Sequence, residues 1–269
     1  MFIEVDPDVR LFVQDWGRGR PFVFIHGWPL SHRAFEYQMV PLSRAGYRVI
    51  GIDLRGFGQS DKPWQGNDYD TWAEDIRKVI EKLDLHDVLL AGFSMGGAIV
   101  MHYAALQEDI RVTKLALMGA AGPLFSRRAD NPYGIPIQEI EETLAAALQD
   151  RSKLARDLGL VNFHTTASPQ FYRWLEGIRM EASPYATVRG LEELRDQDLR
   201  AELKDIKIPT RIFHGVHDQV VPFQLAVELH RHIKDSIFVP FNNSGHGLFY
   251  DERDKLNNEL ARFINNQRL

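Results

Sequence analysis

Apolar residues follow two different periods along this chain. Short apolar runs bounded by polar or turn-forming residues predict buried strands, whereas longer stretches with apolar residues three or four positions apart predict helices. The predicted strands are Val9–Trp16, Phe22–Ile25, Tyr47–Asp53, Val88–Gly92, Val112–Ala120, Thr210–Gly215 and Ile237–Phe241. The predicted helices among them are Ala34–Arg44, Thr71–Leu83, Ser94–Gln107, Gln224–His232 and Asp254–Asn265. Strands that alternate with helices are typical of a mostly parallel sheet covered by helices on both faces.

Two regions depart from this alternation. The first two predicted strands are joined only by the short, glycine-rich segment Gly17–Arg20, which predicts a hairpin and therefore one antiparallel strand. From Ala121 to about Leu203 the strand pattern stops, and helical stretches separated by proline and glycine replace it. These further predicted helices are Ile137–Leu148, Ser152–Leu158, Pro169–Ile178 and Pro184–Asp196.

The place of this helical region in the chain indicates its role. It follows one core strand and precedes another, so we expect it to cover the carboxyl edge of the sheet, where open α/β sheets bind their ligands. The predicted division is a core of residues 1–121 and 204–269 and a helical cap of residues 122–203.

The segment Gly92-Phe93-Ser94-Met95-Gly96-Gly97 carries the strongest chemical signal. It fits the G-x-S-x-G pattern of a nucleophile elbow, and it lies between a predicted strand and a predicted helix, as that motif requires. The sharp turn would hold Ser94 in a strained conformation with its hydroxyl exposed, and a Cβ at Gly92 or Gly96 would collide with the turn. The alternative is a glycine-rich turn that contains a serine by chance.

An elbow serine needs a general base and a carboxylate, which follow it in the chain in the order Ser, Asp or Glu, then His. Asp218 comes just after the strand Thr210–Gly215, and His246 lies between two glycines in the loop after the last strand. We therefore predict that Ser94 is the nucleophile, His246 the base and Asp218 the group that orients His246.

Other candidates for these roles are discounted. Asp251 and Glu252 lie beyond His246, in what the pattern assigns to the final helix, and His214 and His217 flank Asp218 in a supporting position. His102 falls on the helix after Ser94 and is interpreted as a buried histidine with its own partners.

Acyl transfer also needs two hydrogen-bond donors for the developing oxyanion. The backbone N–H of Met95, next to the nucleophile, supplies one of them. The loop His26-Gly27-Trp28-Pro29 follows an early predicted strand, and the backbone N–H of Trp28 is the predicted second donor. The alternative for this loop is an ordinary strand-to-helix turn.

At this point the motifs resemble those of a known family. The chain resembles the α/β-hydrolases, and among them the cofactor-free haloperoxidase and bacterial arylesterase group; the resemblance is weakest from about Ser126 to Leu203. The motifs that carry it are His26-Gly27-Trp28-Pro29, Asp53–Asp61, Gly92–Gly97, His214–Pro222 and Gly245-His246-Gly247, with Trp16-Gly17 and Asn67–Asp70 in support.

The resemblance implies the α/β-hydrolase fold, with a mostly parallel eight-stranded sheet, helices on both faces and a helical cap. It implies a serine hydrolase of small to medium carboxylic or aryl esters, with peracid formation from acid and hydrogen peroxide as a side activity and no metal or haem cofactor. In this fold Asp53 and Arg55 are expected to brace the site. Carbon–carbon bond hydrolases, lactam hydrolases and low-turnover small-molecule receptors of the same fold remain as alternatives.

The substrate pocket is predicted between cap and core. Pro29 fixes its own φ and disfavours a helical conformation at Trp28. This constraint suggests that the Trp28 carbonyl accepts a hydrogen bond from hydrogen peroxide, the alternative being a rigid turn without catalytic effect. For the lining residues, plain packing between cap and core is the alternative. The expected lining, besides Pro29, is Phe125, Phe163, Phe171 and Trp174 from the cap and Val220, Phe223 and Leu248 from the core.

Composition narrows the remaining classes of function. The 269 residues are 44% hydrophobic and 26% charged, which is typical of a folded globular protein. The absence of cysteine excludes thiol chemistry and disulfides. A net charge of −5 disfavours nucleic-acid binding. No apolar run approaches the roughly 20 residues of a membrane span, and the first residues do not resemble a signal peptide. We expect a cytoplasmic enzyme whose partner is a small ester; relatives form oligomers, so a homo-oligomer stays open.

Overall fold

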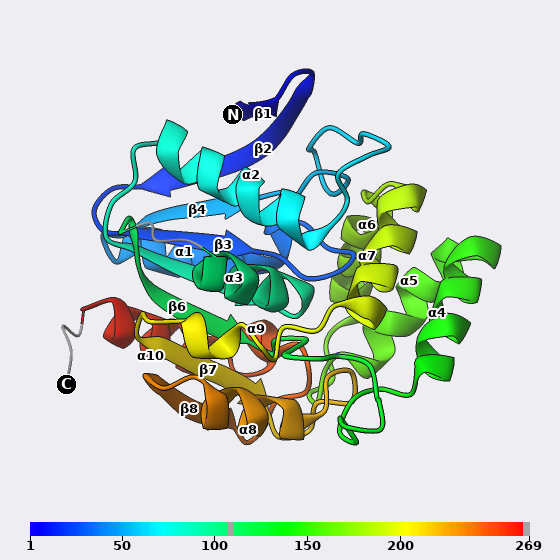
Figure 1. The fold of residues 1–269 in the computed structure, drawn as a ribbon. Helices are drawn as coiled ribbons and strands as arrows, with labels where there is room; N and C mark the ends of the chain where they lie inside the picture. The colour runs from blue at the N-terminus through cyan, green and yellow to red at the C-terminus, as the bar shows by residue number, and fades with distance from the viewer. Residues whose placement is uncertain (107–109, 266–269) are drawn as a thin grey trace.

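The computed structural model describes residues 1–106 and 110–265. Its centre is one eight-stranded sheet in the order β1-β2-β4-β3-β5-β6-β7-β8 (Figure 1). Strands β3 to β8 are parallel, and β2 runs antiparallel to both of its neighbours. The fold class predicted from the sequence is confirmed. The strands are β1 Phe2–Asp6, β2 Val9–Gly17, β3 Pro21–Ile25, β4 Arg48–Ile52, β5 Val88–Phe93, β6 Val112–Met118, β7 Thr210–Gly215 and β8 Ser236–Phe241.

The predicted hairpin between the first two predicted strands is wrong. β2 pairs with β4, and β3 pairs with the opposite edge of β4, so a strand from later in the chain lies between them. Gly17 and Gly19 have positive φ and carry the chain across the end of β4, where a Cβ on Gly17 would lie 2.2 Å from the Tyr47 carbonyl oxygen. The hairpin joins β2 to β1 instead. The sequence pattern missed β1, which buries only Ile3 and Val5.

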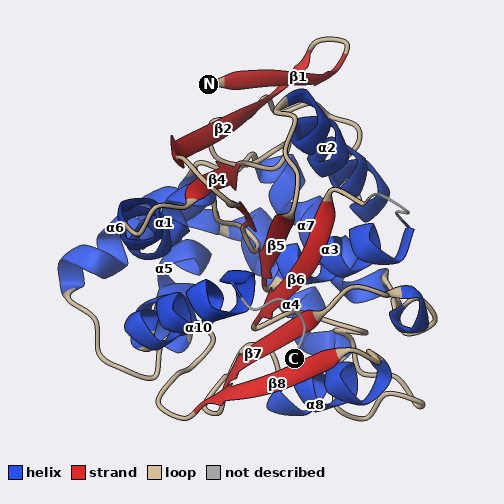
Figure 2. Ribbon diagram, turned by 90° about the vertical axis from the view of Figure 1, so that its left-hand side faces the viewer, coloured by secondary structure: helices blue, strands red, loops and turns tan. Residues whose placement is uncertain are grey.

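Helices cover both faces of the sheet (Figure 2). One face carries α1, α9 and α10, which contact one another, and the other carries α2 and α3, which also pack together. Helix α8 packs on β7 and β8. The predicted end of the third helix, Gln107, lies outside the described residues. These helices are α1 Glu36–Arg44, α2 Tyr69–Lys82, α3 Met95–Leu106, α8 Phe223–His232, α9 Leu248–Asp251 and α10 Arg253–Asn265.

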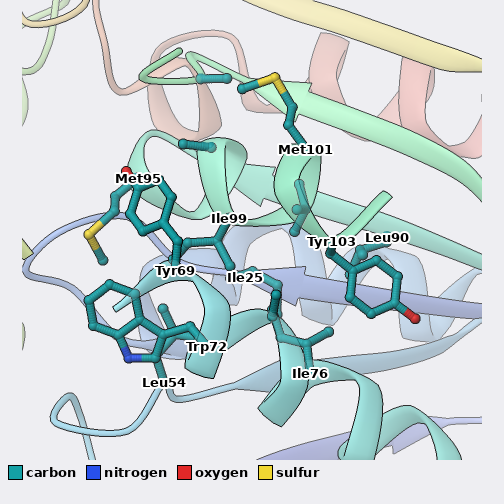
Figure 3. Packing of buried hydrophobic residues seen from close by; sticks show 14 of the residues in the cluster. Ile25, Leu54, Tyr69, Trp72, Ile76, Leu90, Met95, Ile99, Met101 and Tyr103 are labelled. Carbon is teal, nitrogen blue, oxygen red and sulfur yellow. The ribbon is translucent and has the colours of Figure 1, made fainter. Parts of the chain in front are cut away.

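The sheet separates two clusters of buried apolar side chains. Figure 3 shows part of the first, in which Trp72 and Ile76 of α2 and Ile99 of α3 gather around Ile25 of β3. The second contains Phe35 and its neighbours under α1 and α10. Because β5 is buried on both sides, its end is held rigidly where the chain turns into α3.

Four α-helices lie between β6 and β7 in the chain, beyond the carboxyl ends of the strands (Figure 1). We call them the helical insertion: α4 Ile137–Gln149, α5 Arg151–Val161, α6 Pro169–Met180 and α7 Pro184–Asp196. Their starts are encoded locally, since the side chains of Asp150, Ser168 and Ser183 cap α5, α6 and α7. Proline at the first position of α6 and α7 strengthens the same signal.

Within residues 1–106 and 110–265, no helix combines the length and the apolar character needed to cross a lipid bilayer.

Candidate active site

Ser94 lies at the sharp turn between β5 and α3. Its φ is 54°, a left-handed conformation that costs energy for a residue other than glycine. The backbone holds it there, because Ser94 N–H donates to the Met118 carbonyl at 3.0 Å and the Ser94 carbonyl accepts from Ala121 N–H at 3.0 Å. A Cβ on Gly92 would lie 2.3 Å from the Gly96 carbonyl oxygen, and one on Gly96 would lie 2.4 Å from that of Ile25. The glycines of the motif are therefore required by close backbone approach.

Asp218 and His246 form a buried pair. The Asp218 Oδ2 atom lies 2.8 Å from His246 Nδ1, and the exposed fractions of the two side chains are 0% and 4%. The other oxygen, Oδ1, accepts from the backbone N–H groups of Val220 and Val221, each at 2.8 Å. These bonds fix the carboxylate in one orientation.

The environment keeps Asp218 ionised. Burial alone would raise the pKa of Asp218, but the charge of His246 and the hydrogen bonds from His214 and His246 outweigh burial and hold the pKa well below its ordinary value. A carboxylate facing Nδ1 stabilises the tautomer of His246 that carries its proton on Nδ1 and leaves Nε2 free to accept one. The pair is thus arranged as a base with its orienting group.

The loop that carries His246 is held by two carboxylates that were discounted from their place in the sequence. Asp251 ends the short helix α9 and accepts from Gly245 N–H at 2.9 Å, and Glu252 accepts from Ser244 Oγ at 2.8 Å. Asp251 also accepts from His164 N–H of the insertion at 2.9 Å. The prediction that both acids belong to the final helix is wrong, since α10 begins at Arg253. Asp251 and Glu252 therefore position the loop, and among the described residues neither forms a hydrogen bond with the His246 ring.

The other histidines near the predicted site or on the helix after Ser94 each interact with neighbouring side chains or backbone. The His214 ring is fully buried, with Nε2 2.9 Å from the Val221 carbonyl oxygen and 3.2 Å from Asp218 Oδ2. His217 stacks on His164 with ring centroids 3.9 Å apart. Both nitrogens of His102 face carboxylates.

The loop after β3 lies directly beside Ser94. A Cβ on Gly27 would be 2.7 Å from the Ser94 Cβ, so the peptide between Gly27 and Trp28 is next to the nucleophile. Met95 is the first residue of α3, whose N-terminus favours negative charge. The Trp28 ring donates from Nε1 to the Thr187 carbonyl in α7 at 2.8 Å, and the Trp28–Pro29 peptide bond is cis. Both predicted oxyanion donors are thus carried by segments adjacent to Ser94.

His26 anchors this loop from inside the protein. Its Nδ1 lies 3.0 Å from the Gly27 carbonyl oxygen, and its Nε2 accepts from Leu54 N–H at 3.1 Å. Burial lowers the pKa of His26 to about 4, so the ring is neutral at physiological pH. Asp53, beside it, accepts from His32 N–H at 2.7 Å and Gln59 N–H at 2.8 Å, which agrees with the bracing role expected of it.

The low pKa of His26 makes acid stability a test of this arrangement. In the unfolded chain His26 is protonated below its ordinary pKa of about 6.5. In the folded chain it stays neutral until the pH falls to about 4. Stability from this group is therefore complete above pH 6.5 and falls as the pH drops toward 4, by about 3 kcal/mol. His26→Gln keeps an acceptor for Leu54 and does not titrate. Urea unfolding at pH 7 and 4.5 should show a fall in unfolding free energy that is about 2.4 kcal/mol smaller in the variant; equal falls would contradict the assignment.

A cavity of about 210 Å³ lies above Ser94, between the core and the insertion. Ser94, His246 and Trp28 form its floor, and the predicted lining residues Phe125 and Val220 lie in its wall. The rest of the wall is mostly aliphatic and comes from all four helices of the insertion. The other lining residues are Phe93, Ala121, Ile135, Glu139, Ile140, Thr143, Leu158, Val161, Asn162, Arg179, Leu191, Leu194 and Gln219.

Six predicted lining residues are not part of the wall of this cavity. Phe163, Phe171 and Trp174 form an aromatic cluster with Tyr37 and Tyr250, at ring distances from 3.9 to 6.3 Å, which fastens the insertion to the core. The three others fill core positions or the loop interior. They are Phe223, which packs on Phe238 at 5.2 Å, Leu248, fully buried on α9, and Pro29, buried in the loop after β3.

The spacing of apolar residues in the insertion helices could have predicted part of the cavity wall. Three pairs of lining residues are spaced three apart on one helix each, which places both members on one helical face. These pairs are Ile140 and Thr143, Leu158 and Val161, and Leu191 and Leu194. Helical periodicity, rather than aromatic character, marks the surface toward the cavity.

The fold agrees with what comparison with known proteins finds. The chain belongs to the alpha/beta hydrolase fold family, whose model matches residues 20–253. It is 50% identical over 264 residues to the AB hydrolase superfamily protein YisY of Bacillus subtilis (strain 168), covering 98% of each chain. It is 34% identical over 276 residues to a non-heme haloperoxidase of Rhodococcus erythropolis, again covering 98% of each.

A solved structure is similar over nearly the whole chain. It is an esterase (EaEST) from Exiguobacterium antarcticum, with a TM-score of 0.96, 40% identity, and coverage of 98% of this chain and 99% of that one. The resemblance to α/β-hydrolases of the haloperoxidase and esterase group is therefore confirmed, and the family supports a hydrolase.

Proposed function

We propose that this protein is a serine carboxylesterase that works through an acyl-enzyme. The observation that carries the proposal is the buried pair of His246 and Asp218, 2.8 Å apart, of which His246 lines the same cavity as the strained Ser94. A strained serine, an oriented imidazole and an ionised carboxylate are the three groups that acyl transfer by serine requires. The esterase relative supports the same reaction.

In the first half-reaction Ser94 Oγ attacks the ester carbonyl carbon while its proton passes to His246 Nε2. The carbonyl oxygen becomes an oxyanion, for which the N–H groups of Met95 and Trp28 are the proposed donors. Collapse of this intermediate breaks the bond to the alcohol oxygen, which leaves with the proton held by His246. Asp218 stabilises the imidazolium throughout.

In the second half-reaction water attacks the acyl-enzyme carbonyl and gives its proton to His246, and the acid leaves as Ser94 recovers that proton. Hydrogen peroxide in place of water would give a peracid by the same bond changes. Likeness to the Rhodococcus haloperoxidase supports this perhydrolysis as a side activity. Both products arise from one acyl-enzyme, so both depend on Ser94.

The cavity predicts which esters are turned over. Its volume of about 210 Å³ equals that of roughly seven water molecules, which accommodates short acyl groups but not a palmitoyl chain. Steady-state hydrolysis of p-nitrophenyl esters from acetate to palmitate should therefore be fastest at the short end. A maximum at palmitate would contradict the proposed pocket, and a burst of one equivalent without steady turnover would indicate a receptor.

A further inference from the structure

One cation in the wall of the cavity has no counterion within the part of the chain that the structure describes. Arg179, on α6, is 2% exposed and lines the same cavity as Ser94 and His246. Burial lowers the pKa of Arg179 to about 10, which still leaves the guanidinium charged at neutral pH. The active-site cavity therefore contains a fixed positive charge that the proposed ester chemistry does not use.

The partners of Arg179 are neutral. Its Nη1 donates to the Ala155 carbonyl oxygen at 3.2 Å, and its Nη2 donates to Asn162 Oδ1 at 3.0 Å when the Asn162 amide is oriented to donate to the Leu158 carbonyl. Glu176, one turn earlier on α6, raises the pKa of Arg179 slightly but forms no ion pair with it among the described residues.

A second buried arginine shows what a paired guanidinium looks like in this protein. Arg55 is 4% exposed and bonds to both oxygens of Asp75 at 2.7 Å and to Asp6 at 2.6 Å. Within residues 1–106 and 110–265, nothing comparable surrounds Arg179. Of the acidic residues, Glu139 also lines the cavity, but it is an exposed residue on α4 and makes no ion pair with Arg179 among the described contacts.

An unpaired buried charge is costly, since its lost hydration is not replaced by an opposite charge. An apolar side chain at this position would avoid that cost, as Leu158, Val161 and Leu191 do on the same wall. The guanidinium is also a planar fork of donors that fits a carboxylate with two parallel hydrogen bonds. We infer that Arg179 binds a carboxylate of the substrate, so that the preferred substrates are esters that carry a second, free carboxylate group.

Asn162 connects Arg179 to the reacting centre. Its side chain accepts from Arg179, and its backbone carbonyl accepts from Gly247 N–H at 2.6 Å, next to His246. The anion subsite and the loop of the base therefore share one residue. This inference rests on the proposed esterase function and specifies its substrate class.

The test compares two esters of equal shape and different charge. Monoethyl glutarate carries the free carboxylate, and the ethyl ester of glutaramic acid carries a neutral amide in its place. We expect the wild type to prefer the acid in kcat/KM by about tenfold to a hundredfold, mainly through KM, as for a buried charge-assisted pair. Monoesters of succinate and adipate identify the preferred chain length. The acetate ester of 4-hydroxybutyrate tests substrates whose carboxylate is on the alcohol side of the ester. A preference for the anion in either arm supports the inference.

Variants show whether the preference belongs to Arg179. Arg179→Met should reduce the ratio of acid to amide to about one, and Arg179→Lys, which keeps the charge without the fork, should retain part of it. Arg151→Met is the matched control, because Arg151 binds the Ala182 carbonyl and does not line the cavity; its ratio should equal that of the wild type. Arg179→Met should also keep or raise the Tm, whereas a purely structural arginine would lower it.

Two results would overturn the inference and leave the esterase intact. One is equal wild-type kcat/KM for acid and amide in every pair, and the other is an undiminished preference in a folded Arg179→Met. A wild type that hydrolyses no ester, p-nitrophenyl acetate included, would instead contradict the proposed function and this inference with it.

Discussion

Ser94→Ala is expected to lower kcat/KM for p-nitrophenyl acetate by on the order of 10⁴ to 10⁶, since the hydroxyl is the proposed attacking group and no other nucleophile is proposed in the cavity. Perhydrolysis should be lost to the same extent, because the peracid and the acid are released from one acyl-enzyme. The substitution removes one oxygen atom at a residue that is 7% exposed, and alanine tolerates the positive φ no worse than serine does. The Tm should therefore change little.

Ser126→Ala is the matched control for this experiment. Ser126 is also buried, and its Oγ has no hydrogen-bond partner among the described residues, so its removal breaks no bond. It should retain activity within about threefold of wild type, as expected of a substitution away from the reacting atoms. If Ser94→Ala kept more than about a tenth of the wild-type rate, the nucleophile would be misassigned.

The proposed reacting groups could be named from the sequence because each is encoded locally. Ser94 and His246 each follow a strand and are flanked by glycines, and Asp218 follows the C-terminal end of another strand. Parallel strands bring their carboxyl ends to one edge of the sheet, so three local signals become one site without knowledge of any long-range contact.

Strand pairing was not encoded in this way. The segments β2 and β3 adjoin in sequence, yet β4 lies between them because both of its edges find partners there. The apolar pattern of β2 is compatible with either neighbour. The pairing in the folded chain shows which connection exists, and the crowding of Gly17 against Tyr47 agrees with it.

The cavity wall depended on packing that side-chain type does not reveal. Phe171 and Trp174 are large and apolar, and they were expected to face the substrate, but they fasten the insertion to Tyr37 and Tyr250 of the core. Arg179 is one cation among 32 Lys and Arg residues, and nothing in its neighbourhood in the sequence distinguishes it. Arg179 is buried because α5 packs against α6, and its hydrogen-bond partners among the described residues are uncharged.

Asp218→Asn is expected to lower kcat by about 10⁴, and the structure explains why an isosteric change is so severe. The Oδ1 atom accepts from two backbone N–H groups, at Val220 and Val221, so the introduced asparagine must keep its oxygen on that side. Its NH₂ group then replaces Oδ2 and points at His246 Nδ1 and His214 Nε2. His246 can meet a donor only by moving its own proton to Nε2, which leaves no acceptor for the Ser94 hydroxyl proton.

A second expected effect of Asp218→Asn distinguishes a change of the His246 tautomer from the mere loss of a negative charge near the base. His214 Nε2 also lies 2.9 Å from the Val221 carbonyl oxygen and must carry a proton there, so the amide introduced by Asp218→Asn would face a second donor that cannot yield. The variant should lose stability as well as rate, and both are measured on one preparation by Tm and p-nitrophenyl acetate kinetics. Asp251→Asn, which alters a carboxylate that holds the same loop through Gly245 but makes no described bond to the ring, should cost about tenfold or less in kcat. Equal losses in the two variants would show that Asp218 positions the loop rather than selecting the tautomer of His246.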